Sequence, residues 1–249
     1  MEMRISHEAI YRYIYVLPRG ELKRTLIQAL RQEHAYPRNH KTGKPSETRG
    51  KIADMLSIEE RPVEVENRTV PGHWEGDLIV GLESSAIATL VERTTRFTML
   101  LHLPRLGGHG EAPRTKNGPA LAGHGAAAVR DAVATSIVNL PAHLRRTLTW
   151  DQGAEMSQHA QLRVETGMAI YFCDPRSPWQ RGTNENTNGL LRQYFPKGTD
   201  LSKHSAEQLA AVAATLNDRP RKTLSWRTPA EALDELLRSV QQTGVATTP

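Results

Sequence analysis

The chain has 249 residues and a formal net charge of +5, and its single cysteine excludes both an intrachain disulfide framework and a cysteine-rich zinc finger. No apolar run approaches the ~18 residues of a membrane span, and no apolar signal segment opens the sequence, which favours a cytoplasmic protein. The pI near 9.5 favours a polyanionic partner such as nucleic acid, although many ordinary enzymes carry a similar charge.

The first 51 residues are basic, with 11 lysines and arginines against 5 acidic residues. Apolar spacing predicts a helix over His7–Tyr15 and a second helix over Glu21–His34. Residues 37–51 are basic and broken by proline and glycine, which is typical of a linker or of an arm along a DNA backbone. Residues 52–71 are interpreted as a connector, in which the alternation over Val63–Glu66 predicts a short strand.

Strand and helix patterns alternate from residue 72 to residue 173. In chain order we expect strands over Trp74–Val80, Ala86–Val91 and Phe97–Leu101, a polar surface loop over Gly107–Gly123, a helix over Ala126–Val138, a strand over Leu148–Trp150, a helix over Glu155–Thr166 and a strand over Ala169–Cys173. Three helices follow, over Asn184–Phe195, over Ala206–Leu216 with Ser205 as N-cap, and from Pro229 with Thr228 and Glu231 in a capping box. This order predicts an α/β fold, a mixed five-stranded sheet with flanking helices, which is compatible with an RNase H-like architecture.

Several common chemistries are absent from the sequence. It contains no G-x-x-x-x-G-K-[ST] motif of an ATP-binding loop, no G-x-S-x-G and no H-E-x-x-H. Cys173 ends an apolar strand pattern, so a buried structural cysteine is favoured there over a nucleophile.

Three carboxylates stand at informative places in the pattern. Asp77 lies within a predicted strand, Asp151 directly follows another, and Glu185 begins a helix. Converging carboxylates could hold two Mg²⁺ ions about 4 Å apart for in-line phosphoryl transfer. For each acid taken alone, the sequence favours a solvated surface residue or a helix cap over a metal ligand.

Longer motifs surround these three acids and continue toward the C-terminus. They comprise Gly72–Gly81, Leu148–Met156, Tyr171–Asp200, Asn217–Leu224 and Thr228–Glu231. Together they resemble the insertion-sequence-thirty family of bacterial transposases, and the match extends from Ile5 to Leu236.

The resemblance implies an RNase H-like, retroviral-integrase-like catalytic core with a D-D-E triad at Asp77, Asp151 and Glu185. The last two have 33 residues between them, which is typical of this group. It further implies two Mg²⁺ ions, with Mn²⁺ as a substitute, held by the same three residues, and cleavage and strand transfer of double-stranded DNA at transposon ends. Glu75 competes with Asp77 because the two share one strand face, and the family motif favours Asp77.

Further residues are candidates for DNA contact. Asn188 and Arg192 share the helix face of Glu185, with a solvated face as the alternative. The loop before that helix, which is mobile and touches DNA in integrase-like enzymes, supplies Trp179, Gln180 and Arg181. A basic cluster of Arg219, Arg221 and Lys222 suits backbone contacts, or is a plain solubilising patch. Trp74 and Trp150 are expected to pack beneath the site, with base stacking as the weaker alternative.

Family members usually begin with a longer helix-turn-helix region, of which residues 6–15 resemble the last helix. We therefore expect residues 1–51 to be a partial DNA-binding remnant with a basic linker, 52–71 a connector, 72–239 the catalytic core and 240–249 a disordered tail. The chain would then be an N-terminally truncated transposase, or a second reading frame of an interrupted one, that has lost most specific end recognition. We expect a homo-oligomer on DNA at the bacterial nucleoid, with no membrane and no nucleotide cofactor. A non-catalytic remnant that binds DNA or multimerises, and so modulates a full-length transposase, is the alternative.

Overall fold

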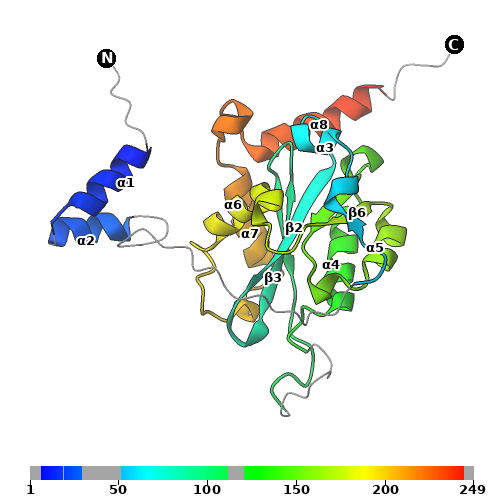
Figure 1. Ribbon diagram of the computed structural model, residues 1–249, viewed down its shortest axis with the longest axis horizontal. Coiled ribbons are helices and arrows are strands. Elements are labelled where there is room, and N and C mark those ends of the chain that lie inside the picture. The colour runs from blue at the N-terminus through cyan, green and yellow to red at the C-terminus, as the bar shows by residue number, and fades with distance from the viewer. Residues whose placement is uncertain (1–6, 19, 30–51, 112–120, 244–249) are drawn as a thin grey trace. The chain divides into compact units, whose positions relative to one another are not determined.

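The computed structural model describes residues 7–18, 20–29, 52–111 and 121–243. The chain divides into two compact units, residues 1–48 and residues 49–249. The first unit contains α1 (His7–Val16) and α2 (Glu21–Gln28), which confirms the first predicted helix and the start of the second (Figure 1). The remainder of the second helix, the basic segment 37–51 and the centre of the 107–123 loop lie outside the described residues.

The second unit is built on one mixed sheet with the strand order β1-β6-β5-β2-β3-β4. Its strands are β1 (Leu56–Ser57), β2 (His73–Val80), β3 (Ala86–Glu92), β4 (Thr98–His102), β5 (Thr147–Trp150) and β6 (Ala169–Phe172). β2, β3 and β4 form an antiparallel meander, whereas β5 and β6 run parallel to β2. The RNase H-like arrangement expected from the sequence is therefore confirmed.

The sheet has six strands rather than the predicted five. The additional strand is β1, which pairs in parallel with Tyr171 and Phe172 at the outer edge of β6. It has only two residues, too few to show a period-2 pattern in the sequence, and it exists because β6 offers unpaired backbone groups.

The alternation over residues 63–66 predicted a short strand, and this prediction is wrong. These residues instead begin the helix α3 (Glu64–Asn67). Val65 is fully buried while Val63 is 75% exposed, so the two valines do not share a buried face. One buried side chain is what a single helical turn against the core requires, whereas a half-buried strand would have covered both.

Helices cover both faces of the sheet, with α4 and α5 on one side of β2 and β3 and with α6 and α7 on the other (Figure 1). Their bounds are α4 (Ala126–Ile137), α5 (His159–Thr166), α6 (Gly182–Leu191), α7 (Ala206–Asn217) and α8 (Pro229–Thr243). β3 is buried along its whole length, and its side chains contribute to the hydrophobic clusters on both faces of the sheet. Ala86, Ala88 and Leu90 join the cluster under α4, and Ile87 joins the cluster under α6 and α7.

Predicted caps set several of these helix ends. Ser205 and Gln208 form a reciprocal capping box at α7, and Thr228 and Glu231 exchange the equivalent bonds at α8. α5 begins later than predicted, because Ala154–Met156 forms a separate 3-10 turn, and it closes at the left-handed Gly167. Among the described residues, no helix combines the length and hydropathy needed to cross a membrane.

Candidate active site

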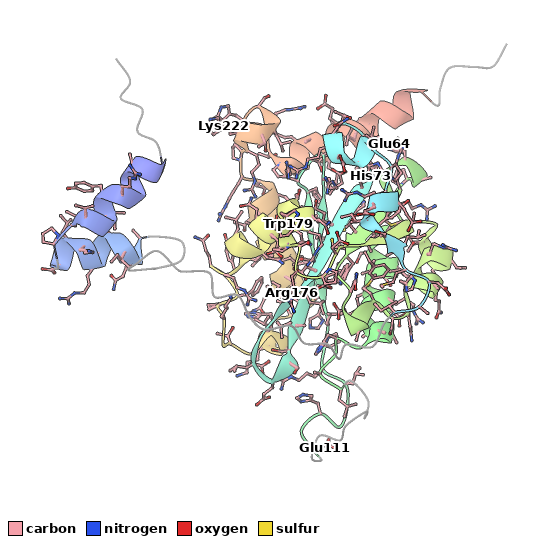
Figure 2. All side chains as sticks on the ribbon, viewed as in Figure 1. Glu64, His73, Glu111, Arg176, Trp179 and Lys222 are labelled. Atoms are coloured by element: carbon pink, nitrogen blue, oxygen red, sulfur yellow. The ribbon has the colours of Figure 1, made fainter. Side chains whose placement is uncertain are left out.

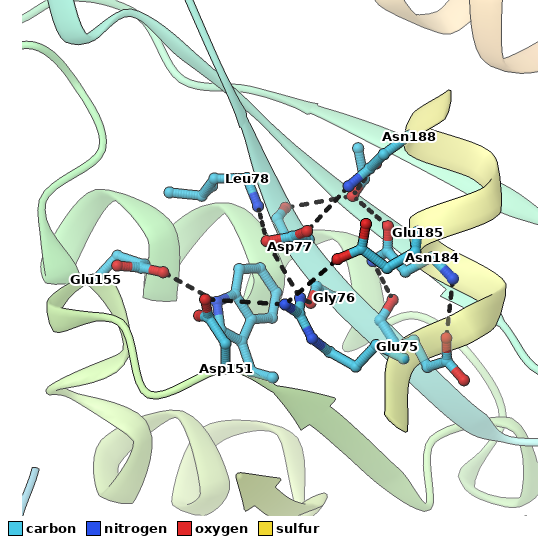
Figure 3. Close-up of polar contacts among 12 residues, drawn as sticks. Glu75, Gly76, Asp77, Leu78, Asp151, Glu155, Asn184, Glu185 and Asn188 are labelled. Carbon is cyan, nitrogen blue, oxygen red and sulfur yellow. Dashed lines mark hydrogen bonds and ion pairs between the residues drawn. The ribbon is translucent and has the colours of Figure 1, made fainter. Parts of the chain in front are cut away.

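Asp77 and Asp151 reach the same level of the sheet from neighbouring parallel strands. In the β2–β5 pairing Glu75 lies opposite Thr149, so two residues further along each chain Asp77 stands beside Asp151. Glu185 comes from the first turn of α6, which packs on β2 and β3. Figure 3 shows the three carboxylates gathered between α6 and the two strands.

Gly76 on β2 leaves space for the ring of Trp150 from the neighbouring strand β5. A Cβ atom on Gly76 would lie 2.0 Å from the Trp150 ring, so only glycine leaves room for the indole at this point of β2. Trp150 and Trp74 are both fully buried, and the Trp74 indole donates to the Leu144 carbonyl at 2.8 Å. Both tryptophans therefore pack in the core beneath the site, as predicted, and neither indole ring is accessible for stacking with a base.

The Arg181 guanidinium lies among all three carboxylates. Its Nη1 is 3.1 Å from Asp77 Oδ1, and its Nη2 is 3.8 Å from Asp151 Oδ2 and 4.0 Å from Glu185 Oε1. Nη1 also donates a 2.8 Å hydrogen bond to the Gly76 carbonyl, and the residue is only 6% exposed. The sequence suggested Arg181 as a DNA contact, and the structure places it inside the carboxylate cluster.

Asp77 is held by donors on both of its oxygens. Its Oδ1 accepts the Leu78 backbone N–H at 2.9 Å, and its Oδ2 accepts the side-chain amide of Asn188 at 3.0 Å. Burial raises the pKa of the Asp77 carboxyl, Arg181 opposes this increase, and the nearby charge of Asp151 adds to it. The pKa of Glu185 is raised as well, first by partial burial and then by the charge of Asp77.

Asp151 has a fourth carboxylate as its neighbour. Glu155 accepts a 3.2 Å hydrogen bond from the Trp150 indole, and burial raises its pKa, with the charge of Asp151 contributing. Glu155 is not among the site residues predicted from the sequence. Its position four residues after Asp151, just past a strand end, was the available signal.

Glu75, the competitor of Asp77, is committed to a buried network. It is fully buried, pairs with the buried Arg93, and accepts the backbone N–H of Asn184 at 2.8 Å. The Asn184 side-chain amide also donates to the Glu75 carbonyl at 3.0 Å. Glu75 therefore anchors the start of α6, while Asp77 is the strand carboxylate that lies within the cluster.

The remaining DNA-contact candidates fall into different environments. Asn188 bonds Asp77, the Arg192 guanidinium lies near the carbonyls of Val80 and Phe195 at 3.4–3.5 Å, and Gln180 bonds Asp174 through its side chain. Trp179 is 73% exposed and projects at the surface beside α6 (Figure 2).

The predicted basic cluster beyond α7 is only partly exposed. Arg219 hydrogen-bonds the Tyr194 hydroxyl and stacks over that ring at 5.8 Å. Arg221 donates to the Leu216 carbonyl at 3.3 Å, and Lys222 is exposed in the turn that follows. Of the three, Lys222 is the residue whose side chain faces solvent most fully (Figure 2).

The donor set of the cluster has the chemistry of a site for a hard divalent cation. Three carboxylates supply oxygen ligands, and Oδ1 of Asp151 is buried without a hydrogen-bond partner. Within the described ranges, no three acidic, histidine or cysteine side chains converge closely enough to ligate an ion directly. The cation at their centre in this structure is the Arg181 guanidinium.

Comparison with known proteins gives close relatives by sequence. The chain is 50% identical over 239 residues to the transposase for insertion sequence element IS1086 of Cupriavidus metallidurans, a match that covers 95% of this chain and 64% of the relative. It is 44% identical to transposase InsI for element IS30C of Escherichia coli, covering 93% and 56%, and 34% identical to the transposase for IS4351 of Bacteroides fragilis, covering 94% and 65%. The chain thus spans less than two thirds of each of these curated relatives.

Comparisons with protein-family models and with solved structures give less information about this chain. No protein-family model matches the chain. Among solved structures, the catalytic core domain of BIV integrase aligns with a TM-score of 0.45 and 15% identity, covering 68% of this chain and 98% of that one.

Proposed function

We propose that this chain, which is homologous to the IS30-family transposases over more than nine tenths of its length, catalyses divalent-metal-dependent cleavage and strand transfer of DNA at insertion-sequence ends. The observation that carries the proposal is the meeting of Asp77, Asp151 and Glu185, from three separate elements, around one buried positive charge. Acids that are merely solvated surface residues are not expected to converge on one cation, whereas the acids of a functional site are.

Asp77, Asp151 and Glu185 would hold two Mg²⁺ ions, with Mn²⁺ as a substitute. When bound, such ions activate water or a DNA 3′-hydroxyl and stabilise the leaving oxygen of a phosphodiester. The chain's own residues prepare the site. Leu78 and Asn188 fix both oxygens of Asp77, and the Glu75 network fixes the helix that carries Glu185.

The proposed substrate is double-stranded DNA, and two exposed side chains suit it. Trp179 offers an exposed aromatic ring next to α6, and Lys222 offers an exposed cation. We infer that the chain acts as a homo-oligomer on DNA at the bacterial nucleoid, the place where such a substrate is found.

The test uses the purified chain with labelled duplex DNA and supercoiled plasmid, in Mg²⁺ or Mn²⁺. Metal-dependent nicking and joining are expected, and Asp151→Asn should reduce both to background. Asp218→Asn, an exposed aspartate after α7, is the matched control and should keep the wild-type rate. Absence of both activity and Mn²⁺ binding would overturn the proposal in favour of a non-catalytic DNA-binding protein.

A further inference from the structure

We propose that Arg181 is an internal counter-ion, which keeps the metal-free carboxylate cluster assembled and which the entering divalent cations must displace. This inference rests on the proposed function, because it concerns the same metal site. It assigns to Arg181 a positioning role that ends when the ions bind.

The geometry places the guanidinium where a cation is needed. Nη1 contacts Asp77 and donates to the Gly76 carbonyl, and Nη2 lies near Asp151 and Glu185. Arginine remains protonated even when buried, so it delivers a permanent positive charge to this place. Without such a charge, three carboxylates in one partly buried cluster would repel one another and take up protons.

The contacts of Arg181 are uneven, which makes it displaceable. Two of its polar contacts are within 3.1 Å, whereas those to Asp151 and Glu185 are 3.8 and 4.0 Å. Its Nε is buried without a hydrogen-bond partner.

The backbone at Arg181 also permits a change of side-chain position. Arg181 lies at the junction between the 3-10 turn Pro178–Arg181 and α6, with non-helical dihedral angles of φ −120° and ψ 40°. It is followed by Gly182, which has no side chain to restrain it. The guanidinium can therefore leave without unwinding the helix that carries Glu185.

Electrostatic repulsion requires the Arg181 guanidinium to leave when divalent ions bind. The cluster holds three negative charges and one positive charge, so it attracts further cations. A divalent ion between Asp77 and Asp151 would stand within a few ångströms of the guanidinium and repel it at short range. Arg181 and the ions therefore compete for the same carboxylate oxygens.

The experiment measures Mn²⁺ binding to the full chain without DNA, by calorimetry and by the electron paramagnetic resonance signal of free Mn²⁺. Arg181→Met removes the charge and keeps an unbranched, largely apolar stem in its place. We expect it to bind Mn²⁺ about tenfold more tightly than the wild type, within the usual range of coupling between two sites. Its melting temperature without metal should fall, and Mn²⁺ should raise that temperature more than it does in the wild type.

Three further variants serve as controls for this test. Arg163→Met removes an exposed arginine from α5 and should bind Mn²⁺ as the wild type does. Arg181→Lys keeps a charge without the forked geometry and should lie between the two, and it carries the test if Arg181→Met does not fold. Adding Asp151→Asn to Arg181→Met should abolish the tight site.

Mn²⁺ binding by Arg181→Met that is equal to or weaker than that of the wild type would overturn the inference. If the wild type cleaves DNA with metal but Arg181→Met does not bind Mn²⁺ more tightly, the proposed function stands and the role proposed for Arg181 is wrong. If neither protein binds Mn²⁺ and the wild type does not cleave DNA, both fall.

Discussion

The side-chain amide of Asn188 donates a 3.0 Å hydrogen bond to Oδ2 of Asp77. One helical turn earlier, Asn184 bonds Glu75, and the Thr89 hydroxyl lies 3.0 Å and 3.2 Å from the side-chain oxygens of the two asparagines. Residues i and i+4 on a helix are about 6 Å apart along its axis, and residues i and i+2 on a strand are about 6.7 Å apart. The two asparagines therefore match the two strand acids, and α6 is fixed against β2 at both points.

Asn188→Ala should weaken the metal site without unfolding the chain. The variant leaves Asp77 Oδ2 without its donor, and loss of such a supporting bond typically costs about 10–100-fold in metal affinity. Mn²⁺ titration by calorimetry is the measurement. Asn186→Ala, on the exposed side of the same helix, is the control. Equal Mn²⁺ affinity in both variants would contradict the prediction.

Glu75→Gln should reduce the free energy of unfolding by about 3–5 kcal/mol, because it leaves the buried Arg93 guanidinium without its counter-charge. Urea unfolding at neutral pH measures the effect. Glu83→Gln removes the exposed partner of Arg105 and should change stability by less than about 1 kcal/mol. A loss no greater than that of Glu83→Gln would show that the charge of Glu75 is not needed to keep Arg93 buried.

Gly76→Ala should destabilise the fold by about 1–3 kcal/mol and lower cleavage activity. The added Cβ would overlap the Trp150 ring, and moving that ring moves Asp151, the next residue. Thermal unfolding and the cleavage assay measure the two effects. Gly189→Ala adds a methyl group to α6 where no atom lies within 4 Å, so it should be neutral or slightly stabilising. A wild-type melting temperature for Gly76→Ala would refute the packing argument.

His73 should make the fold acid-sensitive. Burial, followed by the charges of Arg146, Arg93 and Arg61, lowers the pKa of His73 from 6.5 to about 4. Between these values the unfolded chain binds the extra proton and the folded chain does not, so the contribution of His73 to stability is present above pH 6.5 and is lost as the pH falls toward 4.

We expect this loss to amount to about 1–3 kcal/mol, measured by urea unfolding at pH 7 and pH 4.5. His73→Gln should lose less stability than the wild type over the same interval. His109→Gln, in a turn of the 107–123 loop, should follow the wild type. An equal loss in the wild type and in His73→Gln would remove His73 as the source.

Trp179→Ala should weaken DNA binding and leave folding unchanged, since the ring is 73% exposed and packs in no core cluster. Stacking of a base on an aromatic side chain is worth about 1–3 kcal/mol, or roughly 5- to 150-fold in affinity. Fluorescence anisotropy with labelled single-stranded and nicked duplexes measures it. Trp226→Ala, which removes another exposed tryptophan, should change affinity less. The reverse order would move the contact away from α6.

The sequence alone predicted most regular elements, because the signals that specify them act over a few residues. The apolar period of α4, the N-cap serine of α7, the capping box of α8 and the glycine that closes α5 are all local features. The three acids could be selected for a similar reason, since Asp77 lies within a recognisable strand, Asp151 directly follows another, and Glu185 begins a helix. The strand predicted over Val63–Glu66 is wrong because an alternating pattern of four residues fits a strand and a buried helical turn equally well.

Only the tertiary structure decided what surrounds those acids. Arg181 bonds a carbonyl 105 residues away in sequence, and Asn184 bonds an acid 109 residues away. β1 exists only because β6 has an open edge. Sequence patterns report neighbours along the chain, whereas the charge balance of a buried cluster depends on every group that the fold brings within a few ångströms. For this reason the sequence indicated the carboxylates of the candidate site, and only the fold placed Arg181 among them and Glu75 in the network beneath.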